Sequence, residues 1–227
     1  MRELFKRIQR AGIGIEHACE VGVYLPESSN ILEFLQLGIR GTLVEANPEV
    51  VEKIHLYFAG RADVRIYPYA VWDSDGEITL ARAKSSTFVA ALGSSPALKN
   101  DNYTIAENNS FTVQCRTFSR IDDGTIDLLS IDIEGADWYV LKHLVSRPKV
   151  ISVETHGKYY VNPFLDSITS WMEREGYVAW YKDGSDTIYV RKGLITLRLT
   201  DRLALRSRNL RLAMRRAKGK LKRLARF

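Results

Sequence analysis

The sequence has few cysteines, no long apolar run and no glycine-rich nucleotide loop, and each absence excludes a class of protein. Cys19 and Cys115 are too few for a disulfide scaffold or, alone, for a thiolate zinc site, so a reducing cytoplasm is the expected compartment. No apolar stretch approaches the roughly 18–20 residues that cross a bilayer. The basic first residues lack a continuous apolar core, so we also expect no secretory signal.

Charge is divided unevenly along the chain. The 227 residues carry a net charge of +6, but residues 198–227 contain 12 Lys or Arg and a single acid, Asp201. The remainder is therefore mildly acidic, with a net charge of −5. Because 45% of the chain is hydrophobic, it can also fill a core, which predicts an acidic globular body followed by a basic tail.

Short apolar runs alternate with helical patterns through the body, which predicts a doubly wound α/β fold with a parallel sheet. The expected parallel strands are 16–23, 41–45, 64–67, 127–131 and 150–154. The expected helices are 28–37, 48–57, 138–144 and 164–175, with Ser28 or Ser29 as N-cap of the first and Gly38 after its end. Residues 177–182 and 187–191, joined by Asp-Gly-Ser-Asp, predict a closing antiparallel hairpin.

Between the third and fourth parallel strands the pattern changes. Residues 77–83 and 111–116 alternate like paired strands of an insertion, and a long polar loop separates them. We therefore expect an N-terminal amphipathic segment (1–15), a Rossmann-like domain (16–197) with an insertion at about 77–116, and a basic helical tail (198–227).

The residues that follow the strands are the most informative, because ligands of open parallel sheets bind beyond the carboxyl ends of the strands. Glu20 and Gly22 end the first strand, and Glu45 ends the second. A glycine there lets a ligand approach the backbone, although a tight turn alone also explains Gly22. An acid after the second strand can accept both hydroxyls of a ribose. Since a complete Gly-x-Gly-x-x-Gly loop is absent, the pattern favours an adenosine ligand without phosphates over a dinucleotide.

Six segments form a longer pattern. They are EVG at 20–22, VEANP at 44–48, YAVWDSDGEITL at 69–80, SST at 85–87, IDLLSIDIEGADWYVLKHL at 126–144 and ISVETH at 151–156. Taken in order, they resemble the FkbM-type S-adenosylmethionine-dependent methyltransferases over roughly residues 16–190. The IDIEGA run, with its spacing from VEANP, is the most specific part of the resemblance.

The resemblance implies a class I methyltransferase fold with S-adenosylmethionine as cofactor. Glu20 and Gly22 would lie beside its methionine part, Glu45 would hold its ribose, and Ala70 and Val71 would flank its adenine. The full set of implied cofactor-binding residues is Glu20, Gly22, Glu45, Ala46, Asn47, Ala70, Val71 and Asp132. The chain departs from the family at VYLPESS after Gly22, where members usually carry further glycines.

Methyl transfer requires aligned reactants and a group that takes the proton of the acceptor. Asp132, Glu134, Glu154 and His156 follow strands that converge on one edge, and we expect Asp132, His156 and Glu134 to be catalytic. Asp132, Glu134 and Glu154 are also candidate ligands of a divalent cation. The structural alternatives are that Glu134 caps a helix and His156 is an ordinary loop residue. Ser85–Thr87 is either a surface loop or a lid over the acceptor.

The tail has apolar residues at helical spacing among many basic ones. The apolar stripe is Leu199, Leu203, Leu210, Met214, Ala217, Leu221 and Leu224. A cationic amphipathic helix of this kind lies on anionic lipid, and the same charges bind nucleic-acid phosphates or an acidic partner. We expect contact with the inner face of a membrane through residues 198–227, with nucleic acid as the less favoured partner.

The predicted function is S-adenosylmethionine-dependent O-methylation of a sugar or glycan hydroxyl, where the glycan part comes from the family resemblance. One alternative is a nucleic-acid methyltransferase that uses the tail as a phosphate anchor. The acidic body and the lack of an Asp/Asn-Pro-Pro-Tyr-like motif disfavour it. The other alternative is a non-catalytic nucleoside-binding scaffold.

Overall fold

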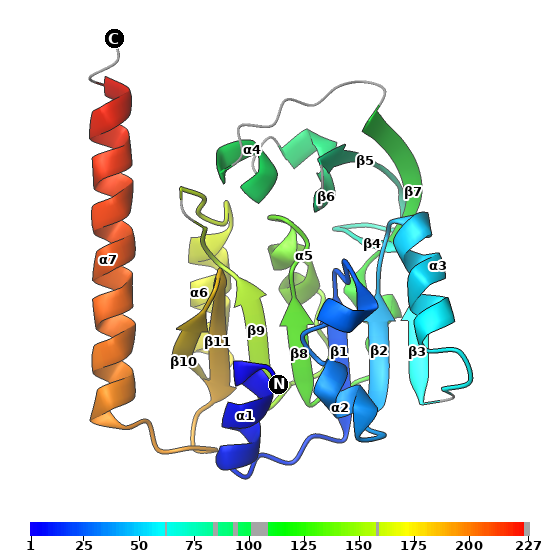
Figure 1. Ribbon diagram of the computed structural model, residues 1–227, viewed down its shortest axis with the longest axis horizontal. Coiled ribbons are helices and arrows are strands. Elements are labelled where there is room, and N and C mark those ends of the chain that lie inside the picture. The colour runs from blue at the N-terminus through cyan, green and yellow to red at the C-terminus, as the bar shows by residue number, and fades with distance from the viewer. Residues whose placement is uncertain (62, 84–85, 93–94, 101–108, 158, 225–227) are drawn as a thin grey trace.

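A computed structural model describes residues 1–61, 63–83, 86–92, 95–100, 109–157 and 159–224. Its main element is a seven-stranded sheet with helices on both faces (Figure 1). The strands are β1 (His17–Val21), β2 (Arg40–Val44), β3 (Val64–Tyr67), β8 (Leu128–Ile131), β9 (Val150–Glu154), β10 (Tyr177–Asp183) and β11 (Asp186–Arg191). Their order is β10-β11-β9-β8-β1-β2-β3, in which only β11 runs antiparallel to its neighbours. The predicted doubly wound sheet and its closing hairpin are confirmed.

Successive residues of the central strands bury their side chains on opposite faces of the sheet. Ala18 and Leu128 belong to one apolar cluster, whereas the next residues, Cys19 and Leu129, belong to the other. One cluster includes α1 (Glu3–Arg10), α2 (Leu32–Gln36) and α3 (Pro48–Tyr57), and the other includes α5 (Asp137–Lys142) and α6 (Leu165–Arg174). Strands that are covered on both faces need a nearly continuous apolar sequence. The apolar runs therefore predict these strands from the sequence.

The N-terminal segment packs against the domain. Leu4, Phe5 and Ile8 of α1 are buried, and the ring of Phe5 meets that of Phe34 edge to face at 5.0 Å. The guanidinium of Arg2 also donates to Glu33 at 3.1 Å. Helix α1 is thus one of the elements that close the core.

The helix expected at 28–37 is shorter than predicted. The segment starts with a 3₁₀ turn, η1 (Pro26–Ser28), and α2 begins only at Leu32 with no side-chain cap. The expected serine cap is wrong, because the hydroxyl of Ser29 accepts from the amide of Ile31 at 3.3 Å, before α2 begins, and donates to the buried carboxylate of Glu20. A buried carboxylate requires hydrogen-bond donors, and here residues 29 and 30 supply them before the helix begins.

A second, smaller sheet stands over the carboxyl ends of the parallel strands (Figure 1). It contains β4 (Ala70–Val71), β7 (Ser110–Arg116), β5 (Gly76–Ala83) and β6 (Ser86–Val89), in that order. The expected pairing of 77–83 with 111–116 is confirmed, since β5 and β7 are antiparallel neighbours. The sequence between them was predicted to be a loop. It instead contains β6, the 3₁₀ turn η2 (Ala90–Leu92) and α4 (Pro96–Asn100), since Phe88 and Val89 are buried.

The strand order reverses at β1, which lies between β2 and β8, and the backbones are tightly joined there. The amide of Gly22 donates to the carbonyl of Val44, and the amide of Asp132 donates to that of Val21, both at 2.9 Å. Gly22 has φ +89°, and a Cβ at this position would lie 1.9 Å from the carbonyl oxygen of Asp132. Only glycine fits, so Gly22 has a structural role whatever ligand it meets.

We expect Gly22→Ala to lower the free energy of unfolding by about 3 kcal/mol or more, because it combines an unfavourable φ with a backbone collision. Gly193→Ala is the matched control. Gly193 has φ +88° and nothing within 4 Å of its added Cβ, so only the conformational cost of about 1–2 kcal/mol applies. Urea denaturation of both variants measures the difference, and equal losses would contradict the proposed contact with Asp132.

Candidate active site

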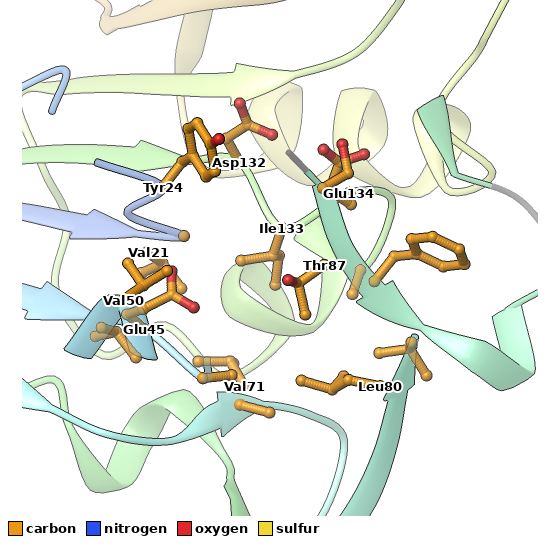
Figure 2. A pocket seen from close by; sticks show the side chains of 18 of the residues that line it. Val21, Tyr24, Glu45, Val50, Val71, Leu80, Thr87, Asp132, Ile133 and Glu134 are labelled. Atoms are coloured by element: carbon orange, nitrogen blue, oxygen red, sulfur yellow. The ribbon is translucent and has the colours of Figure 1, made fainter. Parts of the chain in front are cut away.

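A cavity opens at the carboxyl ends of β1, β2 and β8, beneath the smaller sheet. Figure 2 shows Glu45 and Val50 on the side of the parallel strands, and Leu80 and Thr87 on the side of the smaller sheet. The lining residues come from all of these elements and the loops between them. They are Val21, Gly22, Tyr24, Val44, Glu45, Ala46, Val50, Tyr69, Ala70, Val71, Leu80, Ser86, Thr87, Phe88, Val89, Asp132, Ile133, Glu134 and Ala136.

Glu45 is the buried acid of this cavity. One of its carboxylate oxygens accepts from the amide of Val23 at 3.0 Å, and the other accepts from the amide of Asn47 at 2.7 Å. These bonds fix the carboxylate, and each oxygen keeps a further lone pair for a ligand. Burial raises the pKa of Glu45 to about 7 in spite of these donors. The side chain can therefore accept hydrogen bonds from a vicinal diol, most strongly above neutral pH.

The part of the cavity beside Glu45 is apolar. Val50 of α3, Ala70 and Val71 of β4, and Leu80 of β5 all line it. Such a slot beside a diol-binding carboxylate matches the shape and polarity of an adenosine: ribose at the acid, and base between aliphatic side chains.

Asp132 and Glu134 lie in the turn between β8 and α5, and a third acid holds this turn in place. The carboxylate of Asp137 accepts from the amides of Ile133 and Gly135, each at 3.2 Å. Glu134 has φ +56°, a left-handed conformation that costs a non-glycine residue about 1–2 kcal/mol. The turn thus directs Glu134 to the cavity at the expense of local strain, which is common at functional sites.

A second loop is tied to the same acid. The side-chain amide of Asn162 donates to Asp137 at 2.7 Å and to the carbonyl of Glu154 at 2.9 Å. Asp137 is fully buried, and burial raises its pKa to about 7. This network joins the end of β9 to the turn that carries Asp132 and Glu134.

Asp132, Glu154 and Asp186 lie close enough together to raise one another's pKa values. Burial, followed by the charges of Asp186 and Glu134, holds the pKa of Asp132 well above its usual range. Burial and the charge of Asp132 do the same for the pKa of Glu154, which faces Asp186 across the β9–β11 pair. The raised pKa values favour the protonated forms of these acids, and only their ionised forms are stronger proton acceptors than an ordinary aspartate.

The charge of the cavity restricts its ligand. Glu45, Asp132 and Glu134 are acidic, and none of the described residues that line it is Lys, Arg or His. In their ionised forms these side chains repel a phosphate-bearing nucleotide and favour a positively charged ligand, which in turn lowers their raised pKa values.

The structure brings together most of the residues implied for the cofactor, but not all. Gly22, Glu45, Ala46, Ala70, Val71 and Asp132 line the cavity, whereas Glu20 and Asn47 do not. The carboxylate of Glu20 instead accepts hydrogen bonds from the hydroxyl of Ser29 and the amide of Asn30, in the segment before α2. Asn47 caps α3 by accepting from the amide of Glu49 at 3.1 Å.

His156 and Glu154 also lie outside the lining of this cavity. Nδ1 of His156 lies 2.9 Å from the hydroxyl of Thr155 and 3.5 Å from the ammonium of Lys182. Of the predicted catalytic residues, Asp132 and Glu134 face the cavity. Thr87 of the proposed lid lines it too, while Ser85 lies outside the described residues.

The candidate cation site is not supported. Within the described part of the chain, no three His, Cys, Asp or Glu side chains are arranged to hold a metal ion. Asp132 and Glu154 are close enough to influence each other's pKa, but this reflects electrostatic coupling of buried acids.

Sequence reasoning missed Asp137, Asn162 and Tyr24. Asp137 follows the IDIEGA run directly, and an acid in the first turn of a helix is a usable signal. Its partner Asn162 is distant in sequence, and no local pattern predicts that bond. Tyr24 lines the cavity with about half of its surface exposed, and it lies in the loop that departs from the glycine-rich type.

Comparison with known families identifies the domain. Residues 19–179, more than half of the chain, match the model of the methyltransferase FkbM domain. The chain belongs to the FkbM methyltransferase family. Its class of reaction is accordingly methyl transfer from S-adenosylmethionine. No curated protein sequence matches the chain.

Solved structures agree with the fold of this FkbM domain. A "putative caffeoyl-CoA O-methyltransferase" from Staphylococcus aureus is similar with a TM-score of 0.51 and 13% identity, over 83% of this chain and 80% of that one. A ribosomal protein L11 methylase from Lactobacillus delbrueckii subsp. bulgaricus gives a TM-score of 0.43 and 12% identity, over 83% and 76%. At these identities the first similarity establishes the class I methyltransferase fold alone.

The buried acids generate a prediction about stability. Burial raises the pKa of Glu20 to about 7 from an ordinary value of 4.5. Its contribution to stability is therefore complete below pH 4.5 and is lost as the pH rises through 7. Glu20→Gln keeps an acceptor for Asn30 and a partner for Ser29 but cannot ionise. We expect this variant to be more stable than the original at pH 8, by on the order of 2 kcal/mol, and equally stable at pH 4.5.

Glu33→Gln provides a control of opposite sign. Hydrogen bonds and the charge of Arg2 outweigh desolvation and lower the pKa of Glu33, so its loss should destabilise the protein at pH 8. Urea denaturation at both pH values measures the effects. A Glu20→Gln variant that is less stable than the original at pH 8 would refute this view of the buried carboxylate.

Proposed function

We propose that the protein binds S-adenosylmethionine in the cavity of Figure 2 and methylates a hydroxyl of a sugar or glycan. The observation that carries the proposal is the lining of this cavity in an FkbM-family domain, where the described residues at the switch point of the sheet include three carboxylates and no cationic side chain. S-adenosylmethionine carries its transferable methyl group on a positively charged sulfur and has no phosphate, so its chemistry fits these residues.

Different residues of the cavity contact different parts of the cofactor. Glu45 accepts hydrogen bonds from the ribose hydroxyls, and Ala70 and Val71 contact the base. Gly22 leaves room for close approach of the ligand to the end of β1. Asp132 and Glu134 lie on the opposite side of the cavity from Val71 and Leu80, where their charges complement a cationic sulfur (Figure 2).

Asp132 is the proposed proton acceptor. A hydroxyl becomes a competent nucleophile as its proton leaves, and Asp132 has a carboxyl group in the cavity. The positive sulfur of a bound cofactor would lower the raised pKa of Asp132 and so favour the ionised form that accepts a proton. The acceptor oxygen forms the new bond to carbon, the electrons of the carbon–sulfur bond remain on sulfur, and the proton passes to Asp132. His156 is not part of the cavity lining, so we assign it no step.

The polarity of the cavity mouth supports an uncharged, hydroxyl-rich acceptor. Glu134 can accept hydrogen bonds from hydroxyl groups, and the half-exposed ring of Tyr24 offers an apolar face on which a sugar ring can stack. A nucleic-acid backbone brings one negative charge per nucleotide, which these acids would repel.

The raised pKa of Glu45 predicts how cofactor binding depends on pH. Only the ionised carboxylate is a strong acceptor for both ribose hydroxyls, so affinity should rise with pH through about 7. We expect S-adenosylhomocysteine to bind about tenfold more tightly at pH 8 than at pH 6, and Glu45→Gln to remove this dependence. Isothermal titration calorimetry at the two pH values measures both effects.

Glu49→Gln is the control for this experiment. Its carboxylate is exposed, pairs with Arg82 and lies on the neighbouring helix, so the pH dependence should remain. The assignment of Glu45 is wrong if Glu45→Gln binds S-adenosylhomocysteine with the affinity and pH profile of the original protein.

Replacement of Asp132 tests the proposed proton transfer. We expect Asp132→Asn to lower kcat by at least about 100-fold while S-adenosylhomocysteine affinity changes less than about threefold. Methyl transfer from labelled S-adenosylmethionine to a panel of saccharides and glycans provides the assay, and single-stranded RNA and DNA provide the competing acceptors. Asp73→Asn, an exposed carboxylate paired with Lys142, is the control with unchanged kcat.

Two results would contradict the proposal. Methylation of the nucleic acids but none of the saccharides would exclude the proposed acceptor class. Full activity of Asp132→Asn together with loss of activity in His156→Gln would transfer the role of proton acceptor to His156.

A further inference from the structure

The C-terminal helix α7 (Leu199–Leu224) has two different faces. On one face Leu205, Arg208 and Leu212 are half-buried. On the other, Leu199, Leu203, Leu210 and Met214 have between 52% and 75% of their surface exposed. These four residues follow one another at intervals of four, seven and four, which places them on a single stripe of an α-helix.

The contacts of the first face fix the orientation of the stripe. The guanidinium of Arg208 donates to the carbonyls of Lys182 and Gly184 at 2.8 and 3.0 Å, and Arg7 pairs with Asp201 at 3.7 Å. Strand β10 is the edge strand of the sheet, and α7 packs beside it. Because the docked residues face β10, the apolar stripe points away from the domain. Leu205 and Leu212 face the domain, so the four exposed apolar residues are not needed to cover the sheet edge.

Basic residues accompany the exposed stripe along its length. Asp201 is the only acid from residue 198 onward, against 12 Lys and Arg, and it already pairs with Arg7. Arg202 and Arg206 are exposed and follow Leu199 and Leu203 by three residues each, so they lie beside the stripe. The helix thus offers an apolar strip with a large positive charge beside it. No described helix is both long and apolar enough to cross a membrane, and this includes α7.

We propose that α7 is a docking surface for an anionic lipid membrane. The helix lies in the interface with Leu199, Leu203, Leu210 and Met214 among the acyl chains and its basic residues at the lipid headgroups. Each basic residue near the surface strengthens attraction to anionic lipid, and the buried leucines supply the apolar part of the binding energy.

The packing of α7 also sets the orientation of the domain. Strand β10 is parallel to β9, so its end at Asp183 lies at the same edge of the sheet as the cavity. Arg208 binds at this end, and α7 continues beyond it with its most basic part (Figure 1). The domain therefore rests on the membrane through α7 with β10 as its nearest strand, and β11 and β9 separate β10 from β8, the first strand that ends at the cavity.

The same observations disfavour other occupants of the stripe. A nucleic acid would neutralise the basic residues but leave four large apolar side chains in water. A second copy of the chain would cover the leucines but bring two strongly positive helices together. An anionic bilayer satisfies both the apolar and the charged part of the helix.

Vesicle co-sedimentation with the full chain tests the proposal. The probes are vesicles of phosphatidylcholine alone and vesicles with about one-third phosphatidylglycerol. We expect binding to the anionic vesicles to be at least tenfold tighter, and to weaken as salt concentration rises. Leu203→Gln combined with Leu210→Gln should weaken it at least tenfold, since both side chains are exposed and can change without loss of folding.

A matched pair of changes on the same helix separates the stripe from the helix as a whole. Ala204 and Asn209 are also exposed but lie off the stripe, so Ala204→Gln combined with Asn209→Gln should bind the anionic vesicles like the original protein. Arg202→Glu combined with Arg206→Glu should reduce the preference for anionic lipid at least tenfold. Circular dichroism confirms that each variant is folded.

Three outcomes would overturn the proposal. The first is no binding of the original protein to anionic vesicles. The second is binding that the two leucine substitutions leave unchanged, which would indicate charge attraction alone. The third is a dimer in analytical ultracentrifugation that the leucine substitutions dissociate, which would show that a second copy covers the stripe. None of these readouts depends on the cofactor, so they test the membrane-docking proposal independently of the methyltransferase assignment.

Discussion

The contact between Gly22 and the backbone of Asp132 is the constraint on which the site depends. It holds the end of β1 against β8 at the place where strand order reverses, so that chain segments diverge above it and leave a cavity. The same contact fixes the start of the turn that carries Asp132 and Glu134. A side chain at position 22 would separate the two strands, and both the fold and the cavity would change together.

Electrostatics then determine what the cavity can hold. Glu20, Glu45 and Asp137 are buried with pKa values of about 7, and burial together with neighbouring acids also raises the pKa values of Asp132 and Glu154. Burying so many acids costs stability, and hydrogen bonds to backbone amides offset only part of that cost. The arrangement suits a cationic ligand and a proton acceptor, which is the chemistry that methyl transfer to a hydroxyl requires. It is a poor arrangement for any ligand that carries phosphate.

Much of the fold could be predicted because its local signals agree with the tertiary structure. Pro48 at the first turn of α3 and the apolar runs of the parallel strands predicted those elements almost to the residue. The catalytic edge was less predictable. Asp132 follows β8, and Glu154 and His156 lie at the end of β9, so all three have the same sequence signal. Strand β8 borders β1, whereas β9 lies one strand further away. Of the three residues, only Asp132 therefore faces the cavity. The bond between Asp137 and Asn162, and the bond between Ser29 and Glu20, form only in the folded chain and have no local signature.

The central claim is that the cavity is built for an adenosine ligand that carries no phosphate. Calorimetric titration of the folded protein with S-adenosylhomocysteine, NAD and ATP tests it most directly. The account predicts micromolar, one-to-one binding of S-adenosylhomocysteine and no measurable binding of the two phosphate-bearing nucleotides. Binding of NAD or ATP with equal or greater affinity, or no binding of S-adenosylhomocysteine by protein shown to be folded, would contradict it.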